Sequence, residues 1–260
     1  MDRQARADAI VRATLSLADA DLRTHYVATL ARTWPIGELA EVLDAVCERA
    51  EQAEATSREA LIAIVDALNG EGMDDLVQRL REQAAGNFLL ALERLIRLPP
   101  RSHRPTSSAP PREAPEREGR GGSVPLGARK SLARRADRDT LLRMLLDPHP
   151  DVIRPCLANP LLDEDDVVRL GARRPGRAEV LGEIARSPWV HRPRVRMTLV
   201  MNPATPLDVV VRLAGLLLRP ELTMAARSPA VPAPVRAICL EHLERRPPVR
   251  EPDPSEPDLQ

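Results

Sequence analysis

Cys239 and His242 are the residues whose types and spacing come closest to a metal site. They lie three positions apart, so a helix would place both on one face. A structural zinc site needs four such ligands, and the other cysteines, Cys47 and Cys156, are far away in the sequence. Cys156 also aligns with Leu199 in the internal repeat described below. We therefore predict that these cysteines belong to the hydrophobic core and that the chain has no metal or cofactor site.

The acidic run Asp163-Glu164-Asp165-Asp166 is a second concentration of reactive side chains. Paired carboxylates serve as catalytic acids and bases or as cation ligands, but this run lacks the glycine and the terminal glutamate of an EF-hand loop. It follows Asn159-Pro160, and acidic side chains are favourable in the first turn of a helix because of the helix dipole. The run therefore predicts a solvated helix start.

Sequence motifs for catalysis are missing. The chain has no Gly-x-Ser-x-Gly, His-Glu-x-x-His or phosphate-loop pattern, and its five histidines are scattered. Since no motif positions an acid, a base or a nucleophile, we predict that the protein has no catalytic residues and is not an enzyme.

Arginines gather at two places in the second half of the chain, where helices are expected to meet. Some helical-repeat proteins grip phosphates with such arginines, so nucleic-acid binding is the alternative function. Against it, residues 136–246 carry 17 basic and 14 acidic side chains, a net charge of only +3, and few aromatic residues are available for stacking. Lys130 is the only lysine, so we attribute the arginine excess to compositional bias. The candidate surface residues are Arg173, Arg174, Arg177, Arg192 and Arg194.

Trp189 is the one large residue at an expected helix entry, directly after Ser187-Pro188. Two interpretations stay open. It is a hydrophobic staple that fixes the entry of the chain into a helix, which we favour because aromatic residues are usually buried. Alternatively, it is an exposed anchor for a partner protein, and for this reason it joins the arginines as a candidate interaction residue.

Composition sets the compartment that we expect. The three cysteines form no Cys-x-x-Cys pair, which fits a reducing compartment. The first residues mix charges instead of forming a signal-peptide core, and the longest apolar run, Leu213 to Leu218, is too short to span a bilayer. We expect a cytoplasmic protein without a membrane span.

The sequence of residues 1–98 predicts an acidic bundle of about six helices. This segment carries 11 basic and 17 acidic side chains. Apolar residues recur at helical spacing, and no strand pattern appears. Thr56 and Glu59 predict a capping box, and Asn69-Gly70 predicts a left-handed helix end. Two expected apolar stripes of the bundle are Leu22, Tyr26 and Leu30, and Phe88, Leu92 and Leu95. A third, made of Leu141, Leu142, Leu145 and Leu146, is expected on a helix that begins at about Leu126 or Ser131 and ends at Leu146.

Two segments predict disorder. Residues 99–125 are rich in proline and arginine and have no apolar stripe, so they read as a flexible linker. Residues 247–260 carry five prolines and four acidic residues and read as a disordered tail.

Residues 126–246 contain an internal repeat. Val167-Val168-Arg169-Leu170 recurs 43 positions later, from Val210, and Ala185-Arg186-Ser187-Pro188 recurs 41 positions later, from Ala226. The register aligns Val152, Val195 and Val235, and also Cys156, Leu199 and Cys239. A residue of the N-cap type followed by proline predicts helix starts at Asp147, Asn159, Ser187, Asn202 and Ser228. Such short helices must stack on their neighbours to bury their apolar faces.

The stretch Asn202-Pro203-Ala204-Thr205-Pro206, followed by Leu213-Ala214, resembles the repeat signature of bacterial leucine-rich repeat variant proteins. Asn159-Pro160 begins a second copy in which Asp163 replaces the second proline and Gly171 the alanine. The resemblance covers residues 147–246 and implies a short α-solenoid related in architecture to HEAT and armadillo repeats, a shape that usually binds other molecules without catalysis.

These observations combine into one expectation. The chain is all-α, with an N-terminal helical bundle and a short C-terminal α-solenoid of HEAT/armadillo-like repeats, joined by a disordered linker. We expect a non-catalytic scaffold that binds one or more proteins through the repeat surface, with the linker letting the two parts engage separate partners.

Overall fold

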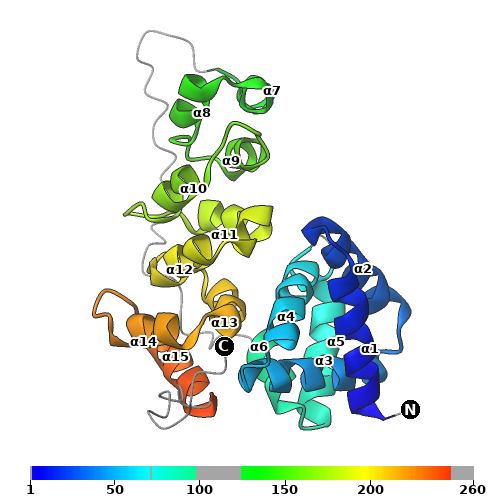
Figure 1. The fold of residues 1–260 in the computed structure, drawn as a ribbon. Helices are drawn as coiled ribbons and strands as arrows, with labels where there is room; N and C mark the ends of the chain where they lie inside the picture. Colours follow the sequence, from blue (N-terminus) through cyan, green and yellow to red (C-terminus); the bar gives the residue numbers. More distant parts are fainter. Residues whose placement is uncertain (1, 71, 98–123, 247–260) are drawn as a thin grey trace, which may run out of the picture.

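The computed structural model describes residues 2–70, 72–97 and 124–246, and within these ranges the regular structure is entirely helical (Figure 1). The all-α prediction is therefore confirmed for this part of the chain. The predicted linker, apart from Val124 and Pro125, and the whole predicted tail lie outside the described residues. None of the described helices is long and apolar enough to cross a membrane.

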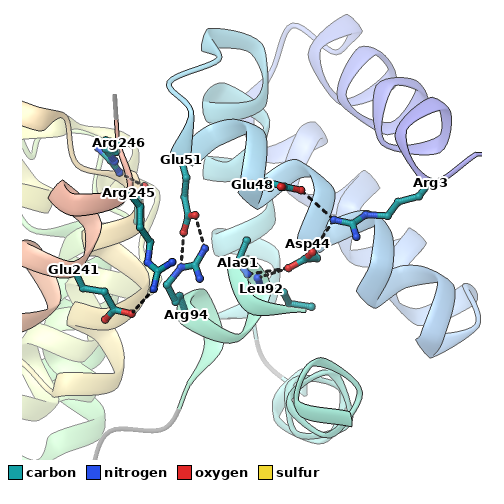
Figure 2. A network of polar contacts seen from close by, with 11 residues as sticks. Arg3, Asp44, Glu48, Glu51, Ala91, Leu92, Arg94, Glu241, Arg245 and Arg246 are labelled. Carbon is teal, nitrogen blue, oxygen red and sulfur yellow. Dashed lines mark hydrogen bonds and ion pairs between the residues drawn. The ribbon is translucent and has the colours of Figure 1, made fainter. Parts of the chain in front are cut away.

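The first part of the chain is a bundle of six helices built around α3. Helix α3 packs against α1, α4, α5 and α6, and its Leu39, Val42 and Val46 are almost fully buried. The polar Asp44 is buried as well, because its carboxylate accepts hydrogen bonds from the backbone N–H groups of Ala91 and Leu92, both at 2.9 Å (Figure 2). The helices are α1 (Arg3–Ser16), α2 (Ala20–Thr33), α3 (Ile36–Glu51), α4 (Ala55–Leu68), α5 (Asp74–Gly86) and α6 (Leu90–Ile96).

Several local predictions in the bundle were wrong. Phe88 lies in the turn before α6 with a positive φ of 54°, and it is 82% exposed instead of buried with Leu92 and Leu95. Leu22 is exposed too. The positive φ expected at Asn69-Gly70 falls on Gly72. The expected capping box is replaced by a bond from the Thr56 hydroxyl to Glu54, because α4 begins one residue before Thr56.

The second part is a stack of short helices in two layers. Contacts join α7 to α9, α9 to α11, α10 to α12, α12 to α14 and α13 to α15, so most of these helices pack on one that lies two positions away in the chain. Figure 1 shows α9, α11 and α13 on the side that faces the bundle, and α10, α12 and α14 on the other. The helices are α7 (Leu126–Arg135), α8 (Arg138–Met144), α9 (Pro150–Leu157), α10 (Glu164–Gly171), α11 (Ala178–Arg186), the 3₁₀ helix η1 (Pro188–His191), α12 (Pro193–Met201), α13 (Leu207–Leu216), α14 (Arg219–Arg227) and α15 (Ala233–Arg245).

The single helix expected over 126–146 is instead two, α7 and α8. Asp137 separates them, since its carboxylate accepts a hydrogen bond from the backbone N–H of Thr140 at 2.8 Å and caps α8. Of the four leucines expected at a buried edge, Leu141 and Leu145 are buried, whereas Leu142 and Leu146 are exposed.

The register of the repeat agrees with burial in the structure. Val152, Val195 and Val235 are all at most 4% exposed. Cys156, Leu199 and Cys239 are completely buried. The sequence alignment therefore identified core positions correctly.

Helix starts were predicted wrongly at four of the five cap-proline pairs. Only Ser187-Pro188 begins a helix, the 3₁₀ helix η1. After Asn159-Pro160 the helix begins at Glu164, and after Asn202-Pro203 it begins at Leu207. The Asn side-chain oxygens close local turns instead, accepting from the backbone N–H groups two residues on, at 2.9 Å and 3.0 Å.

The two asparagines join successive helices of one layer. The amide of Asn159 donates to the carbonyl oxygens of Ala133 and Ala136 at the end of α7, at 3.3 Å and 3.2 Å. The amide of Asn202 donates to those of Gly171 and Arg173 at the end of α10, at 2.7 Å and 3.1 Å. The last carbonyls of a helix have no partner inside it, so these bonds satisfy groups that would otherwise be buried unpaired.

Arg246 occupies the same place one repeat later, 44 positions after Asn202. Its guanidinium donates to the carbonyl oxygen of Gly215 at 2.9 Å and also to that of Leu217, at the end of α13. A side-chain donor therefore recurs at this place although the residue type changes from Asn to Arg. The helix-end carbonyls need a hydrogen-bond donor, and either side chain supplies one.

The bundle packs on the stack through α13, which contacts both α4 and α6. Arg58 of the bundle donates to the Leu217 carbonyl oxygen at 3.2 Å, so this oxygen binds a guanidinium from each part of the chain. Arg97 and Glu241 form an ion pair at 2.7 Å. A Cβ on Gly215 would lie only 3.1 Å from Leu95 of α6, so the helices approach closely here. The two parts are thus in direct contact.

Replacing Asn202 by leucine tests the layer contacts. The change removes both amide bonds and leaves buried carbonyls unpaired, so we expect the unfolding free energy to fall by about 2–4 kcal/mol. Denaturant unfolding followed by circular dichroism measures this. The control is Asn87→Leu, since the Asn87 amide makes a similar bond to a helix carbonyl but is exposed. Equal effects of the two changes would contradict the role given to Asn202.

Candidate functional site

Trp189 lies in η1, half-buried against the core. Its indole N–H donates to the carbonyl oxygen of Leu157 at 2.9 Å, at the end of α9. The indole therefore pairs with a helix-end carbonyl, as Asn159 and Asn202 do. The same side chain also lines the largest cleft described below.

The candidate arginines do not meet at one place. Arg173 donates to the carbonyl oxygen of Leu145 at 2.5 Å, Arg174 donates to that of Met201 at 3.0 Å, and Arg194 pairs with Asp165 at 2.7 Å. Arg177 and Arg192 are exposed. Arg173 and Arg177 line a small hollow of about 370 Å³ beside Leu145 and Val180. Three of the five guanidiniums are thus bound to acceptors within the chain.

The largest cleft lies between the bundle and the stack and has a volume of about 680 Å³. The end of α4 forms one wall, and α9, α11 and η1 form the other. The apolar part of its lining includes Leu157, Leu162, Pro188 and Trp189 from the stack. The lining also includes Asp66, Asn69, Arg154, Ala158, Glu183 and Arg186.

Glu183 forms ion pairs with two arginines of this cleft. Its side chain is only 7% exposed, and it pairs with Arg154 at 2.7 Å and 3.1 Å and with Arg186 at 3.1 Å. The two arginine side chains are 57% and 58% exposed. One buried carboxylate therefore anchors two guanidiniums whose side chains are more than half exposed. Arginine in such a position binds carboxylates and aromatic rings well.

The bundle side of the cleft is polar. Asp66 of α4 accepts a hydrogen bond from the Thr24 hydroxyl at 2.9 Å and lies 3.5 Å from the imidazole of His191. Asp66 thus links the bundle to η1 at the edge of the cleft. Sequence reasoning missed these residues because they come together only through the packing of the two parts. The one local signal was Glu183, a charged residue on the apolar face of α11.

The acidic run is only partly solvated, which corrects the sequence-based prediction. Asp163 caps α10, and Asp163 and Asp166 form a reciprocal capping box with distances of 2.9 Å and 3.3 Å. The Asp166 side chain is 1% exposed and pairs with Arg138 of α8. Arg138 also pairs with Asp163 at 2.8 Å. The run therefore joins neighbouring helices of the stack.

Cys239 is buried in α15, as the register predicted, and His242 on the same helix is buried as well. Burial raises the pKa of the Cys156 and Cys239 thiols to about 11. Burial, helped by the nearby Arg246 and Arg97, lowers the pKa of His242 to about 3. In the described part of the chain, no three His, Cys, Asp or Glu side chains are grouped so that they could hold a metal ion.

Comparisons with protein-family models, with curated proteins and with solved structures gave no match for this chain.

The buried His242 makes stability depend on pH. Unfolding returns its pKa from about 3 to about 6.5, so below pH 6.5 the unfolded chain binds a proton that the folded chain does not. We expect this group to lower the unfolding free energy by about 2 kcal/mol between about pH 7.5 and pH 5. Denaturant unfolding at both pH values measures it, and His242→Gln should remove this part of the decrease. His25→Gln, at an exposed histidine, is the control, and an unchanged pH dependence in His242→Gln would contradict the assignment.

Proposed function

We propose that this protein is a non-catalytic scaffold that binds a partner protein in the cleft between the bundle and the helix stack. The observation that carries the proposal is the cleft itself, with an apolar wall around Trp189 beside two guanidiniums anchored by Glu183. Aromatic and arginine side chains in a concave setting are typical of residues that dominate protein interfaces.

We further infer that residues 126–246 form a short α-solenoid of the HEAT or armadillo type, as the resemblance to leucine-rich repeat variant proteins implies. Two observations support this inference. Five pairs of stack helices, α7 with α9, α9 with α11, α10 with α12, α12 with α14 and α13 with α15, pack on each other across one intervening helix. The donors Asn159, Asn202 and Arg246 recur at spacings of 43 and 44 residues, each at the end of a neighbouring helix. Solenoids of this kind offer a long rigid surface to a partner.

The ionisable groups of the cleft support binding and not catalysis. Glu183 is held in ion pairs with Arg154 and Arg186, and Asp66 accepts a hydrogen bond from Thr24. A catalytic acid or base needs to exchange a proton with a bound substrate, and a carboxylate fixed between two guanidiniums is a poor group for that task.

Because the bundle and the stack are in contact, a single partner can bind to both parts at once. We expected the bundle and the repeats to hold separate partners, but Arg58 and Arg97 of the bundle bind groups of the stack, and Asp66 lies 3.5 Å from the His191 imidazole. A partner segment in the cleft would touch both parts at once. Nucleic-acid binding has no comparable support, because Arg173, Arg174 and Arg194 donate to acceptors of the chain.

Filling the cleft tests the proposal. Ala158 is the exposed residue that ends α9, and Ala158→Trp would occupy the cleft without removing a side-chain contact. Ala172→Trp is a matched control, since Ala172 is the exposed residue that ends α10 with nearly the same backbone conformation. Tagged proteins would be expressed in the native host and their partners compared by affinity capture and mass spectrometry.

We expect at least one protein to be captured equally by the wild type and Ala172→Trp and to be reduced by roughly tenfold or more by Ala158→Trp, which corresponds to a loss of ~1.4 kcal/mol. Circular dichroism would first show that both variants are folded. If every captured protein binds Ala158→Trp as well as it binds the wild type, the cleft is not the binding site and the proposal fails.

A further inference from the structure

A histidine and a carboxylate meet where η1 of the stack touches α4 of the bundle. The imidazole Nε2 of His191 lies 3.5 Å from a carboxylate oxygen of Asp66, and both side chains are mostly buried. Within the described part of the chain, Nε2 is buried and has no hydrogen-bond partner. The two groups are therefore close enough for an ion pair but do not form a hydrogen bond.

This contact lies at the edge of the cleft and joins its two walls. Asp66 is held in place on the bundle side, because the same carboxylate oxygen accepts a hydrogen bond from the Thr24 hydroxyl at 2.9 Å. His191 is the last residue of η1, and η1 also carries Trp189. Asp66 and Trp189 both line the cleft. A change in the contact between His191 and Asp66 therefore acts on both walls.

Protonation of the imidazole changes this contact. Histidine is the side chain whose charge ordinarily changes between about pH 5 and pH 8. A protonated imidazole carries a hydrogen on both nitrogens, so Nε2 would then face the carboxylate as a charged donor. Charge-assisted hydrogen bonds of this type are about 2.7–2.9 Å long, which is shorter than the present separation. Protonation should thus draw the two side chains together.

Other charged groups surround His191. On α12, the guanidinium of Arg196 donates to the backbone carbonyl oxygen of His191 at 2.8 Å, and its positive charge opposes protonation of the ring. On α11, Glu183 and Arg186 are paired with each other at 3.1 Å. Asp66 approaches the ring itself, whereas the bond from Arg196 goes to the backbone. We therefore expect the attraction by Asp66 to exceed the repulsion by Arg196.

We propose that His191 and Asp66 form a pH-dependent contact that sets how closely the bundle and the stack approach at the cleft. As the pH falls from about 8 to about 5.5, the imidazole gains a proton, binds the carboxylate and narrows the cleft. Carboxylates usually gain protons only below about pH 5, so Asp66 keeps its charge over this range. An effect on partner binding would rest on the proposed function, whereas the contact itself does not.

Spin labels on the bundle and the stack test the proposal in the full chain. Leu22→Cys lies on α2, the helix whose Thr24 holds Asp66, and Ala172→Cys lies at the end of α10, outside the cleft lining. Both positions are exposed, and the native cysteines are buried. Pulsed electron paramagnetic resonance would give the distribution of distances between the labels at about pH 8 and about pH 5.5.

We expect the fraction of molecules at the longer distances to fall by roughly threefold or more at the lower pH, because the ion pair favours the closed arrangement. His191→Gln and Asp66→Asn should each abolish this change. His25→Gln is the control, since His25 is exposed beside Thr24, and it should leave the change intact. His242 stays neutral in the folded protein over this range, because burial lowers its pKa to about 3.

The same distance distribution at both pH values would overturn the proposal. A change that persists in both His191→Gln and Asp66→Asn would also overturn it, because another group would then be responsible. So would a shift to longer distances at the lower pH, since repulsion by Arg196 would then be the stronger interaction.

The outcome is separable from that of the proposed function, because the labels report on the cleft without a partner. If the distances do not depend on pH while Ala158→Trp blocks partner capture, the scaffold proposal stands and the pH-dependent contact is wrong. If the distances depend on pH as expected while Ala158→Trp leaves capture unchanged, the contact stands and the scaffold proposal fails.

Discussion

The structure depends on satisfying the carbonyl groups at the ends of many short helices. The α-helices of the stack are seven to thirteen residues long, and each leaves several carbonyls without partners inside the helix. Side chains farther along the chain supply the donors: Asn159 and Asn202 follow α9 and α12, and Trp189 lies in η1. Because each donor belongs to one helix and each acceptor to its neighbour, satisfying the backbone also fixes how the helices stack.

The same type of bond joins the bundle to the stack. At the end of α13, the Leu217 carbonyl oxygen accepts from Arg246 of the stack and from Arg58 of the bundle. This joint, together with the close approach of α6 at Gly215, sets the separation of α4 and α5 from the stack. The cleft lined by Trp189 lies between α4 and the stack, so it is formed by the docking of the two parts.

The sequence allowed correct predictions of those features of the fold that follow from the spacing of apolar residues along a helix. The all-helical fold and the buried register of Val152, Val195 and Val235 were predictable, since burial repeats with the helix. The role of Asn202 was not, because its partners lie 29 and 31 residues away and no local pattern encodes them. The prediction that Phe88 is buried was wrong, because Phe88 lies in a turn before α6 and the helical spacing of apolar residues does not extend to it. The cleft could not be predicted, because its two walls come from segments that are far apart in the sequence.

The most direct test of this account is whether the bundle and the stack remain in contact in solution. Arg97→Cys and Glu241→Cys would be combined in one variant, and a short bis-maleimide reagent added to the dilute protein; the native cysteines are buried. The account predicts rapid cross-linking within one chain, seen as faster migration on a denaturing gel. The control pairs Arg97→Cys with Arg134→Cys in α7, at the far end of the stack (Figure 1). Cross-linking no faster than in this control would contradict the account.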